Sequence, residues 1–207
     1  MRAQAEVIST AIIVSVALIV ALGLIYYLNP FTARSQSQYK LYSLLTSYAS
    51  ELEIAPVSTI NTTLNTTSVL IVKNTGSLGF RAYLTIVPFY QRAPVEANVT
   101  GLVYNMTSNY SVIDPGDFTG WTQLNGTNVS AFNIHLYITS SYYRLSDFVG
   151  AANVAVYDLG VLSPGTTRVL KVVLVNPIPT YSYSVIILAR VSNDYYEVGR
   201  FILYSSG

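Results

Sequence analysis

Few side chains in this sequence of 207 residues could carry out chemistry. The chain has one histidine, His135, and no cysteine, so it offers neither a thiolate nucleophile nor a cluster of several histidines around a metal ion. Asp114-Pro-Gly-Asp117 lacks the alternating oxygen ligands of a calcium loop, and we expect a tight turn there. No glycine-rich phosphate cradle follows an expected strand. We therefore expect no enzymatic activity, no cofactor and no metal site.

A different chemistry is indicated by seven asparagines in the pattern Asn-x-Ser/Thr, the acceptor sequence for N-linked glycosylation. They are Asn61, Asn65, Asn98, Asn105, Asn109, Asn125 and Asn128. Seven such sequons within residues 61–130 exceed what random placement would give. The alternative is that Asn-x-Thr is common because it suits turns. Glycosylation would place this part of the chain outside the cell.

The segment that precedes the sequons is the most apolar part of the chain. Val7–Leu28 has no charged residue. At about 1.5 Å per residue, a helix of this length crosses a hydrocarbon core of about 30 Å. Apolar residues then recur with the spacing of one face of an amphipathic helix over residues 39–52: Leu41, Leu44, Leu45, Tyr48 and Leu52.

Two prolines divide this helical region. Pro30 removes an amide donor and clashes with the preceding turn, which predicts a kink or local unwinding near Gly23–Pro30. Pro56 predicts that the helix ends by residue 55.

The rest of the chain alternates apolar and polar residues with the period of a strand. Residues 81–86 and 132–139 each predict a strand with one buried face, and His135 falls on the polar face of the second. Residues 183–191 and 198–204 predict a C-terminal hairpin with a turn at Ser192-Asn193-Asp194. Val169–Val175 is apolar except for Lys171, which indicates a central strand. The predicted fold is α+β, a long N-terminal hydrophobic helix followed by an all-β, immunoglobulin-like sandwich head.

Three interpretations of the first segment compete. A cleaved secretory signal has a shorter apolar run followed by small residues, whereas Phe31-Thr32-Ala33 is bulky at that point. A plain membrane anchor fits the length. The third interpretation is a helix that is kept and packs against copies of itself. Ala11 with Ser15, and Ala17 with Ala21, are pairs of small residues that let helices approach closely.

The residues before the helix favour the third interpretation. Arg2-Ala3-Gln4-Ala5 resembles the cleavage signature of archaeal prepilins, and the arrangement of leader, helix and β head is similar to that of archaeal type IV pilins. The resemblance implies that a prepilin peptidase cuts between Ala3 and Gln4, and that membrane assembly machinery polymerises the mature chain. In that family an acid near the mature N-terminus can pair with the neighbouring amine, a role that Glu6 could take. The alternative is an acid at a helix N-terminus stabilised by the helix dipole.

The predicted organisation is a leader at residues 1–3, an N-terminal helix at 4–55 and a head at 56–207. The predicted function is a structural subunit of an extracellular, glycosylated type IV pilus-like filament for surface adhesion, inserted in the membrane before it assembles with copies of itself. The alternatives are a membrane-anchored cell-surface binding module and an archaellin-like motility filament subunit. Charged residues make up 10% of the chain and the net charge is +1, so nothing favours nucleic acid as a partner.

Overall fold

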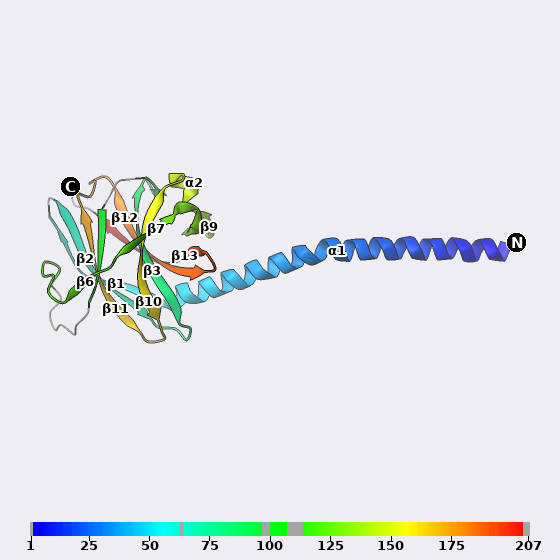
Figure 1. The fold of residues 1–207 in the computed structure, drawn as a ribbon, viewed down its shortest axis with the longest axis horizontal. Coiled ribbons are helices and arrows are strands. Elements are labelled where there is room, and N and C mark those ends of the chain that lie inside the picture. Colours follow the sequence, from blue (N-terminus) through cyan, green and yellow to red (C-terminus); the bar gives the residue numbers. More distant parts are fainter. Residues whose placement is uncertain (1, 63, 97–99, 107–113, 205–207) are drawn as a thin grey trace. The chain divides into compact units, whose positions relative to one another are not determined.

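The computed structural model describes residues 2–62, 64–96, 100–106 and 114–204. For residues 2–12 and 31 it describes the backbone alone. The chain divides into two units, Met1–Leu44 and Leu45–Gly207, and each is considered by itself. The first unit consists of helix, and the second, here called the head, holds all the strands of Figure 1.

One helix, α1, runs from Arg2 to Glu51. It stays helical through Pro30, so, of the kink or local unwinding predicted near Gly23–Pro30, the unwinding is wrong. Pro30 removes a single amide donor, and the turns on either side keep theirs. The hydroxyl of Thr32 also donates to the carbonyls of Leu28 and Asn29, at 3.0 and 2.9 Å, within the same stretch of helix.

The helix ends earlier than expected, because strand β1 begins directly at Leu52. Residues 52–55 pair with β2 instead of forming a last helical turn. The apolar stripe predicted on the second half of the helix is confirmed where α1 enters the head. There Leu45 is fully buried, and the ring of Tyr48 stacks on Phe80 at 4.6 Å. The two compact units divide between residues 44 and 45, so the last turns of α1 belong to the head.

The head contains two sheets, a five-stranded one and an eight-stranded one. The five-stranded sheet is antiparallel, in the order β1 (Leu52–Asn61), β2 (Asn65–Asn74), β11 (Thr167–Val175), β5 (Thr100–Met106) and β6 (Trp121–Gln123). The prediction that residues 169–175 form a central strand is confirmed, because β11 lies between β2 and β5.

The order of the eight-stranded sheet is β7 (Gly126–Ser130), β10 (Asn153–Leu162), β3 (Phe80–Tyr90), β12 (Ser182–Val191), β13 (Asp194–Tyr204), β8 (Ile134–Ile138) and β9 (Ser141–Arg144), with β4 (Ala93–Pro94) paired to β3. Its pairs are antiparallel except β13 with β8. A short 3-10 helix, η1 (Ala131–Asn133), and a short helix, α2 (Ser146–Val149), complete the head. Together the sheets form a β-sandwich whose larger sheet resembles half of a barrel.

The two sheets approach closely at two glycines. A Cβ on Gly101 of β5 would lie 2.5 Å from the side chain of Ile86 in β3. A Cβ on Gly199 of β13 would lie 2.8 Å from the side chains of Leu52 and Ile54 in β1. These glycines let side chains of the opposite sheet fill the space between the layers.

The larger sheet also buries side chains on its other face, where a second core contains Tyr83, Val87, Ile134, Leu136 and Leu145. The solvated face predicted for residues 81–86 is therefore wrong at Tyr83 and Thr85, which are both buried. The alternation of residues within one strand cannot show that other segments of the chain, here η1, β8 and α2, cover its outer face.

The predicted C-terminal hairpin is confirmed. Val191 pairs with Asp194, so the turn consists of Ser192 and Asn193, and Ser192 has a positive φ of 58°. The predicted strand at 132–139 is shorter than expected. Ser130 accepts a hydrogen bond from the amide of Phe132 and begins η1, so β8 starts only at Ile134 and Phe132 is exposed.

Candidate functional site: an apolar helix and a polar head

The first half of α1 exposes apolar side chains in every direction. Ile19 is 69% exposed and Ile25 is 63% exposed, and the intervening positions are exposed as well. By length and composition, α1 is the one helix among the described residues that could cross a membrane, and none of its most apolar window is buried within the protein. A helix that is apolar all round is normally covered by lipid or by other protein.

The small residues predicted to mediate helix packing lie on this surface. Ser15, Ala17 and Ala21 are exposed, while Ala11 falls in the stretch for which only the backbone is described. At 3.6 residues per turn, the Ala11–Ser15 pair and the Ala17–Ala21 pair lie about 120° apart around the helix axis. Their placement would allow two different neighbours to approach closely. Ala3, Gln4 and Glu6 have helical backbone, and their side chains are outside the description.

The sequons fall into three groups. Asn61, Asn125 and Asn128 are exposed on the head. Asn65 and Asn105 are partly buried, in β2 and β5. Asn98 and Asn109 lie outside the described residues.

Lys171 is the main polar feature of the five-stranded sheet, because it is fully buried in a central strand. Its ammonium donates to the carbonyls of Asp117 and Asp114, the latter at 3.3 Å. It also lies 4.2 Å from the ring centroid of Phe118 and 4.6 Å from that of Trp121. Burial lowers the pKa of Lys171, against the opposing effect of the two aspartates. The ammonium joins the Asp114–Asp117 turn to the sheet.

The prediction that Asp114–Asp117 is a tight turn is confirmed, since the amide of Asp117 donates to the carbonyl of Asp114 at 3.3 Å. Both carboxylates accept local amides at 2.8 Å, from Gly116 and Thr119. The hydrogen bond from Thr119 lowers the pKa of Asp117. The sequence singled out Lys171 but not its partners. A lone lysine in an apolar strand indicated that hydrogen-bond acceptors for it had to exist, but not the aromatic rings beside it.

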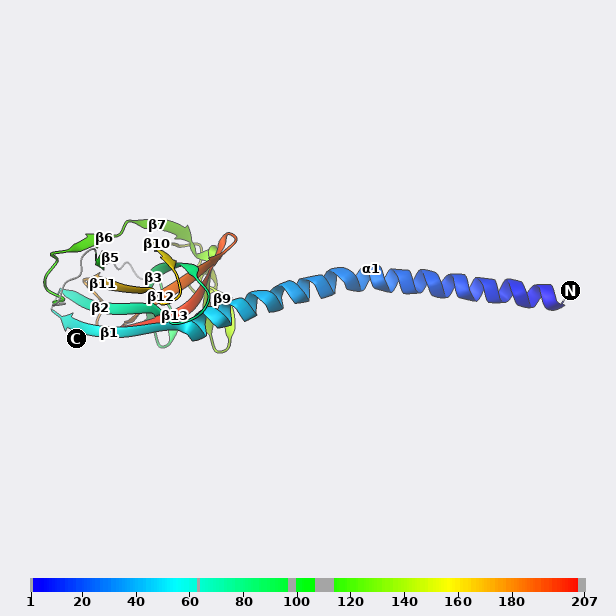
Figure 2. The same cartoon turned by 90° about the horizontal axis from the view of Figure 1, so that it is seen from below.

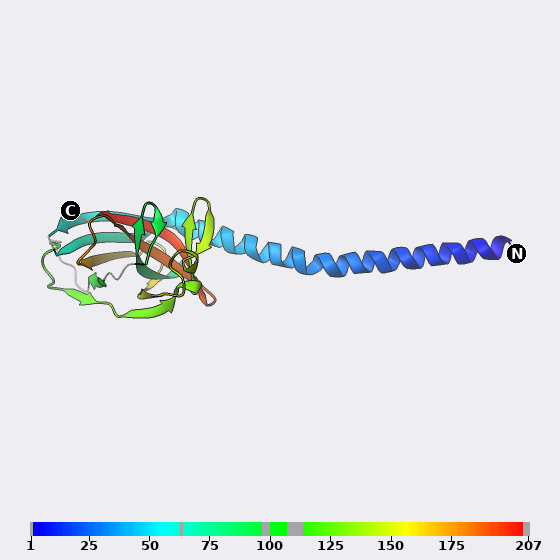
Figure 3. The ribbon, with the colours of Figure 1, turned by 90° about the horizontal axis from the view of Figure 1, so that it is seen from above.

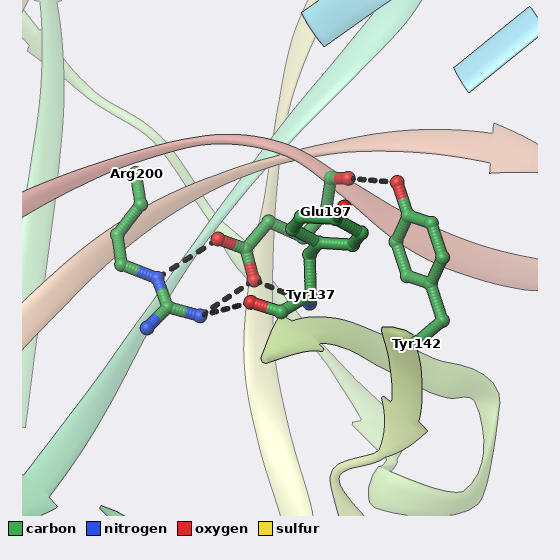
Figure 4. Close-up of polar contacts among 4 residues, drawn as sticks. All are labelled: Tyr137, Tyr142, Glu197 and Arg200. Carbon is green, nitrogen blue, oxygen red and sulfur yellow. Dashed lines mark hydrogen bonds and ion pairs between the residues drawn. The ribbon is translucent and has the colours of Figure 1, made fainter. Parts of the chain in front are cut away.

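A second polar cluster joins β13 to the β8–β9 hairpin (Figure 4). Glu197 is only 6% exposed, and its carboxylate accepts from Arg200 Nε at 2.8 Å and Nη2 at 2.7 Å. The same carboxylate accepts the amide of Tyr137 at 2.9 Å, and Arg200 donates to the carbonyl of Tyr137 at 3.5 Å. The hydroxyl of Tyr142 donates to the carbonyl of Glu197 at 2.8 Å. The side chains of Glu197 and Arg200 therefore provide hydrogen-bond partners for the backbone amide and carbonyl of Tyr137, where β8 diverges from β13.

His135 is less exposed than its place on a polar face suggested. Only 15% of its side chain is accessible, because its ring stacks on Tyr196 at 4.5 Å. Its Nε2 lies 3.8 Å from a carboxylate oxygen of Asp194. Burial is the main effect that lowers the pKa of His135, and Arg144 lowers it further, while Asp194 and Asp147 oppose the change.

The head also contains a cavity of about 420 Å³, within the size range of small-molecule pockets. Val87, Leu145 and Val149 give it apolar walls, and Glu96, Asn153 and Tyr157 give it polar groups. The hydroxyl of Tyr157 already donates to the carbonyl of Gly101 at 2.6 Å. Across the described residues, no group of three or more histidine and acidic side chains is arranged to hold a metal ion.

No protein-family model and no curated protein sequence matches this chain. Among solved structures, AvmM, which catalyses macrocyclization in alchivemycin A biosynthesis, is similar with 7% identity and a TM-score of 0.40, over 76% of this chain and 90% of that one. A CBM3a-L domain of the Clostridium thermocellum scaffoldin cipA is similar with 15% identity and a TM-score of 0.30, over 76% of each chain. The human F-spondin reeler domain is similar with 10% identity and a TM-score of 0.29, over 75% of this chain and 89% of that one. Similarities at this level assign neither a family nor a function.

Proposed function

We propose that this protein is a structural subunit of an extracellular filament of the archaeal type IV pilin class, and that it serves surface adhesion. The observation that carries the proposal is the apolar surface of α1 between Ile13 and Leu28, which is exposed on all sides and joined to a folded head. Copies of the same helix provide a cover of matching chemistry.

In this proposal the helix has two successive environments. It is first held in the bilayer, and is then transferred into a bundle of identical helices. In either place each large aliphatic side chain gains roughly 1.5–3 kcal/mol relative to exposure in water, so dissociation of the bundle into water is very unfavourable. The small-residue pairs at Ala11–Ser15 and Ala17–Ala21 let neighbouring helices approach closely.

The remaining parts of the proposal follow from the prepilin-like N-terminus. A prepilin peptidase removes residues 1–3 between Ala3 and Gln4, membrane machinery assembles the filament, and Glu6 pairs with the amine of the new N-terminus. The head faces the outside of the cell and carries glycans on its exposed sequons. Two sheets that pack face to face and are antiparallel except for the β13–β8 pair support kinship with immunoglobulin-like sandwiches. A motility filament of the archaellin type would use the same helix.

A second candidate function is a membrane-anchored binding module that does not polymerise. The cavity lined by Glu96, Asn153 and Tyr157 favours it, because this cavity is large enough for a small ligand. In this case lipid alone covers α1.

The two candidates differ in what the full chain does outside the membrane. Purified from native cells, a filament subunit appears by electron microscopy as filaments that contain this chain, with a mature N-terminus at Gln4 by mass spectrometry. An anchored module appears as monomers that detergent disperses, and monomers alone would overturn the filament proposal. An N-terminus at Arg34 would show that the first helix is a cleaved signal.

A further inference from the structure

The head has four free sheet edges among its described strands. β1 and β6 are the outer strands of the five-stranded sheet, and β7 and β9 are those of the eight-stranded sheet. Figures 2 and 3 show β1 along one side of the head and the consecutive strands β6 and β7 along the opposite side. An edge strand presents unpaired amides and carbonyls, which can pair with another chain.

Three of these edges lack lysine and arginine side chains, which are one of the devices by which proteins protect a sheet edge. β6 and β7 contain no charged residue, and Glu53 is the one charge in β1. β9 differs, because it ends in the exposed Arg144, whose amide donates to Asp147 of the neighbouring α2.

The exposed sequons lie at the three edges with few charges. Asn61 is the last residue of β1, Asn125 lies between β6 and β7, and Asn128 is within β7. Asn128 alternates with Val129, which packs against the second core, so the Asn128 side chain points away from that core. The edge β9 has no sequon.

The partly buried sequons lie on interior strands. Asn65 begins β2, which pairs with β1 and β11, and Asn105 is in β5, which pairs with β11 and β6. Asn105 lies two residues from the fully buried Val103 and therefore shares its face of the strand. A glycan on Asn105 would have to leave the space between the two sheets.

We propose that asparagine-linked glycans on Asn61, Asn125 and Asn128 protect the β1, β6 and β7 edges from pairing with other heads. A bulky hydrated sugar prevents another strand from approaching to the spacing of about 4.8 Å that pairing requires. Self-association is then left to α1. This inference rests on the proposed function to the extent that the head must be extracellular to be glycosylated.

The first test is site occupancy on the full chain isolated from its native cells. Glycopeptide mass spectrometry should find sugar on Asn61, Asn125 and Asn128 and none on Asn105. Unmodified edge sequons, or equal occupancy of Asn105, would overturn the proposal. Filament formation is scored separately, so filaments without glycans would overturn this inference and leave the proposed function standing.

The second test asks what the glycans do. Because the natural chain has no cysteine, Thr122→Cys on β6 supplies a single exposed thiol at one edge. Combining it with Asn61→Gln, Asn125→Gln and Asn128→Gln should raise oxidative cross-linking between heads several-fold over Thr122→Cys alone. Asn133→Gln is the matched control, since Asn133 is exposed but is not in a sequon. Equal cross-linking with and without the three sequons, at an unchanged melting temperature, would overturn the protective role.

Discussion

The amide and the hydroxyl of Thr75 both donate to the carbonyl oxygen of Glu51, each at 2.8 Å. Glu51 is the last residue of α1, and the final carbonyls of a helix have no partner within it. Thr75 follows Asn74, a buried residue whose side-chain Nδ2 donates to the carbonyls of Leu78 and Leu162 at 2.7 and 2.9 Å. The end of the helix is therefore held by a loop that is itself anchored in the head.

Thr75→Val should lower the free energy of unfolding of the head by about 0.5–1 kcal/mol, because it removes the hydroxyl hydrogen bond and keeps the amide. Thermal or urea denaturation of the full chain in detergent measures the change. Ser77→Ala, in an exposed position of the same loop, is the control and should have no effect. An equal loss in both variants would contradict a specific role for Thr75.

The lowered pKa of Lys171 predicts a pH dependence at alkaline pH. Between the folded pKa and the ordinary value of about 10.4, the unfolded chain holds a proton that the folded chain has lost, so stability rises with pH in this window. Lys171→Met should remove that rise. Trp121, the only tryptophan of the chain, reports the same titration by fluorescence. Identical pH profiles of stability in the two proteins would exclude this explanation.

Glu197→Ala should destabilise the head by about 3 kcal/mol, because it leaves the mostly buried Arg200 without its partner and the amide of Tyr137 without its acceptor. Chemical denaturation measures the loss. Glu197→Gln keeps an acceptor for Tyr137 and should lose less. The double variant Glu197→Ala with Arg200→Met should recover part of the stability, and purely additive losses would show that the two side chains act independently.

The lowered pKa of His135 predicts that the head loses stability at acidic pH. Its folded pKa is lower than the ordinary value of about 6.5, so below that pH the unfolded chain takes up the proton first and stability falls until the folded pKa is passed. His135→Phe keeps the stacking on Tyr196 and should flatten this slope. Melting temperatures measured between pH 7 and 4 test this prediction. If their slope against pH is the same in His135→Phe as in the natural chain, carboxylates rather than His135 cause the sensitivity to acid.

Local sequence patterns were sufficient for the elements whose environment is set by neighbours along the chain. The helix and the β12–β13 hairpin are of this kind. The apolar run of β11 also predicted its central position, although its partners β2 and β5 are distant in sequence. The patterns failed at other places where distant segments meet. The pattern placed Tyr83 on a solvated face, whereas residues of η1, β8 and α2 pack over it. Residues 52–55 form a strand because they pair with β2. The partners of Lys171 come from a loop more than 50 residues away, so only the need for them was predictable.

The final prediction concerns the apolar surface of α1. Ala17→Phe should abolish filaments while the protein still inserts in the membrane, because phenylalanine is apolar but overfills a close contact between helices. Ile19→Phe is the matched control: it places the same ring two residues away, at an exposed position that already holds a large side chain. Electron microscopy scores the filaments and membrane fractionation scores insertion.

The comparison separates helix packing from general apolarity. If copies of α1 pack through the small residues, Ala17→Phe loses filaments and Ile19→Phe keeps them. If lipid is the permanent cover, both variants fractionate with the membrane and neither they nor the natural chain yields filaments, which is the behaviour of the anchored binding module. Filaments from both variants would show that the heads, rather than Ala17 and its neighbours, hold the subunits together.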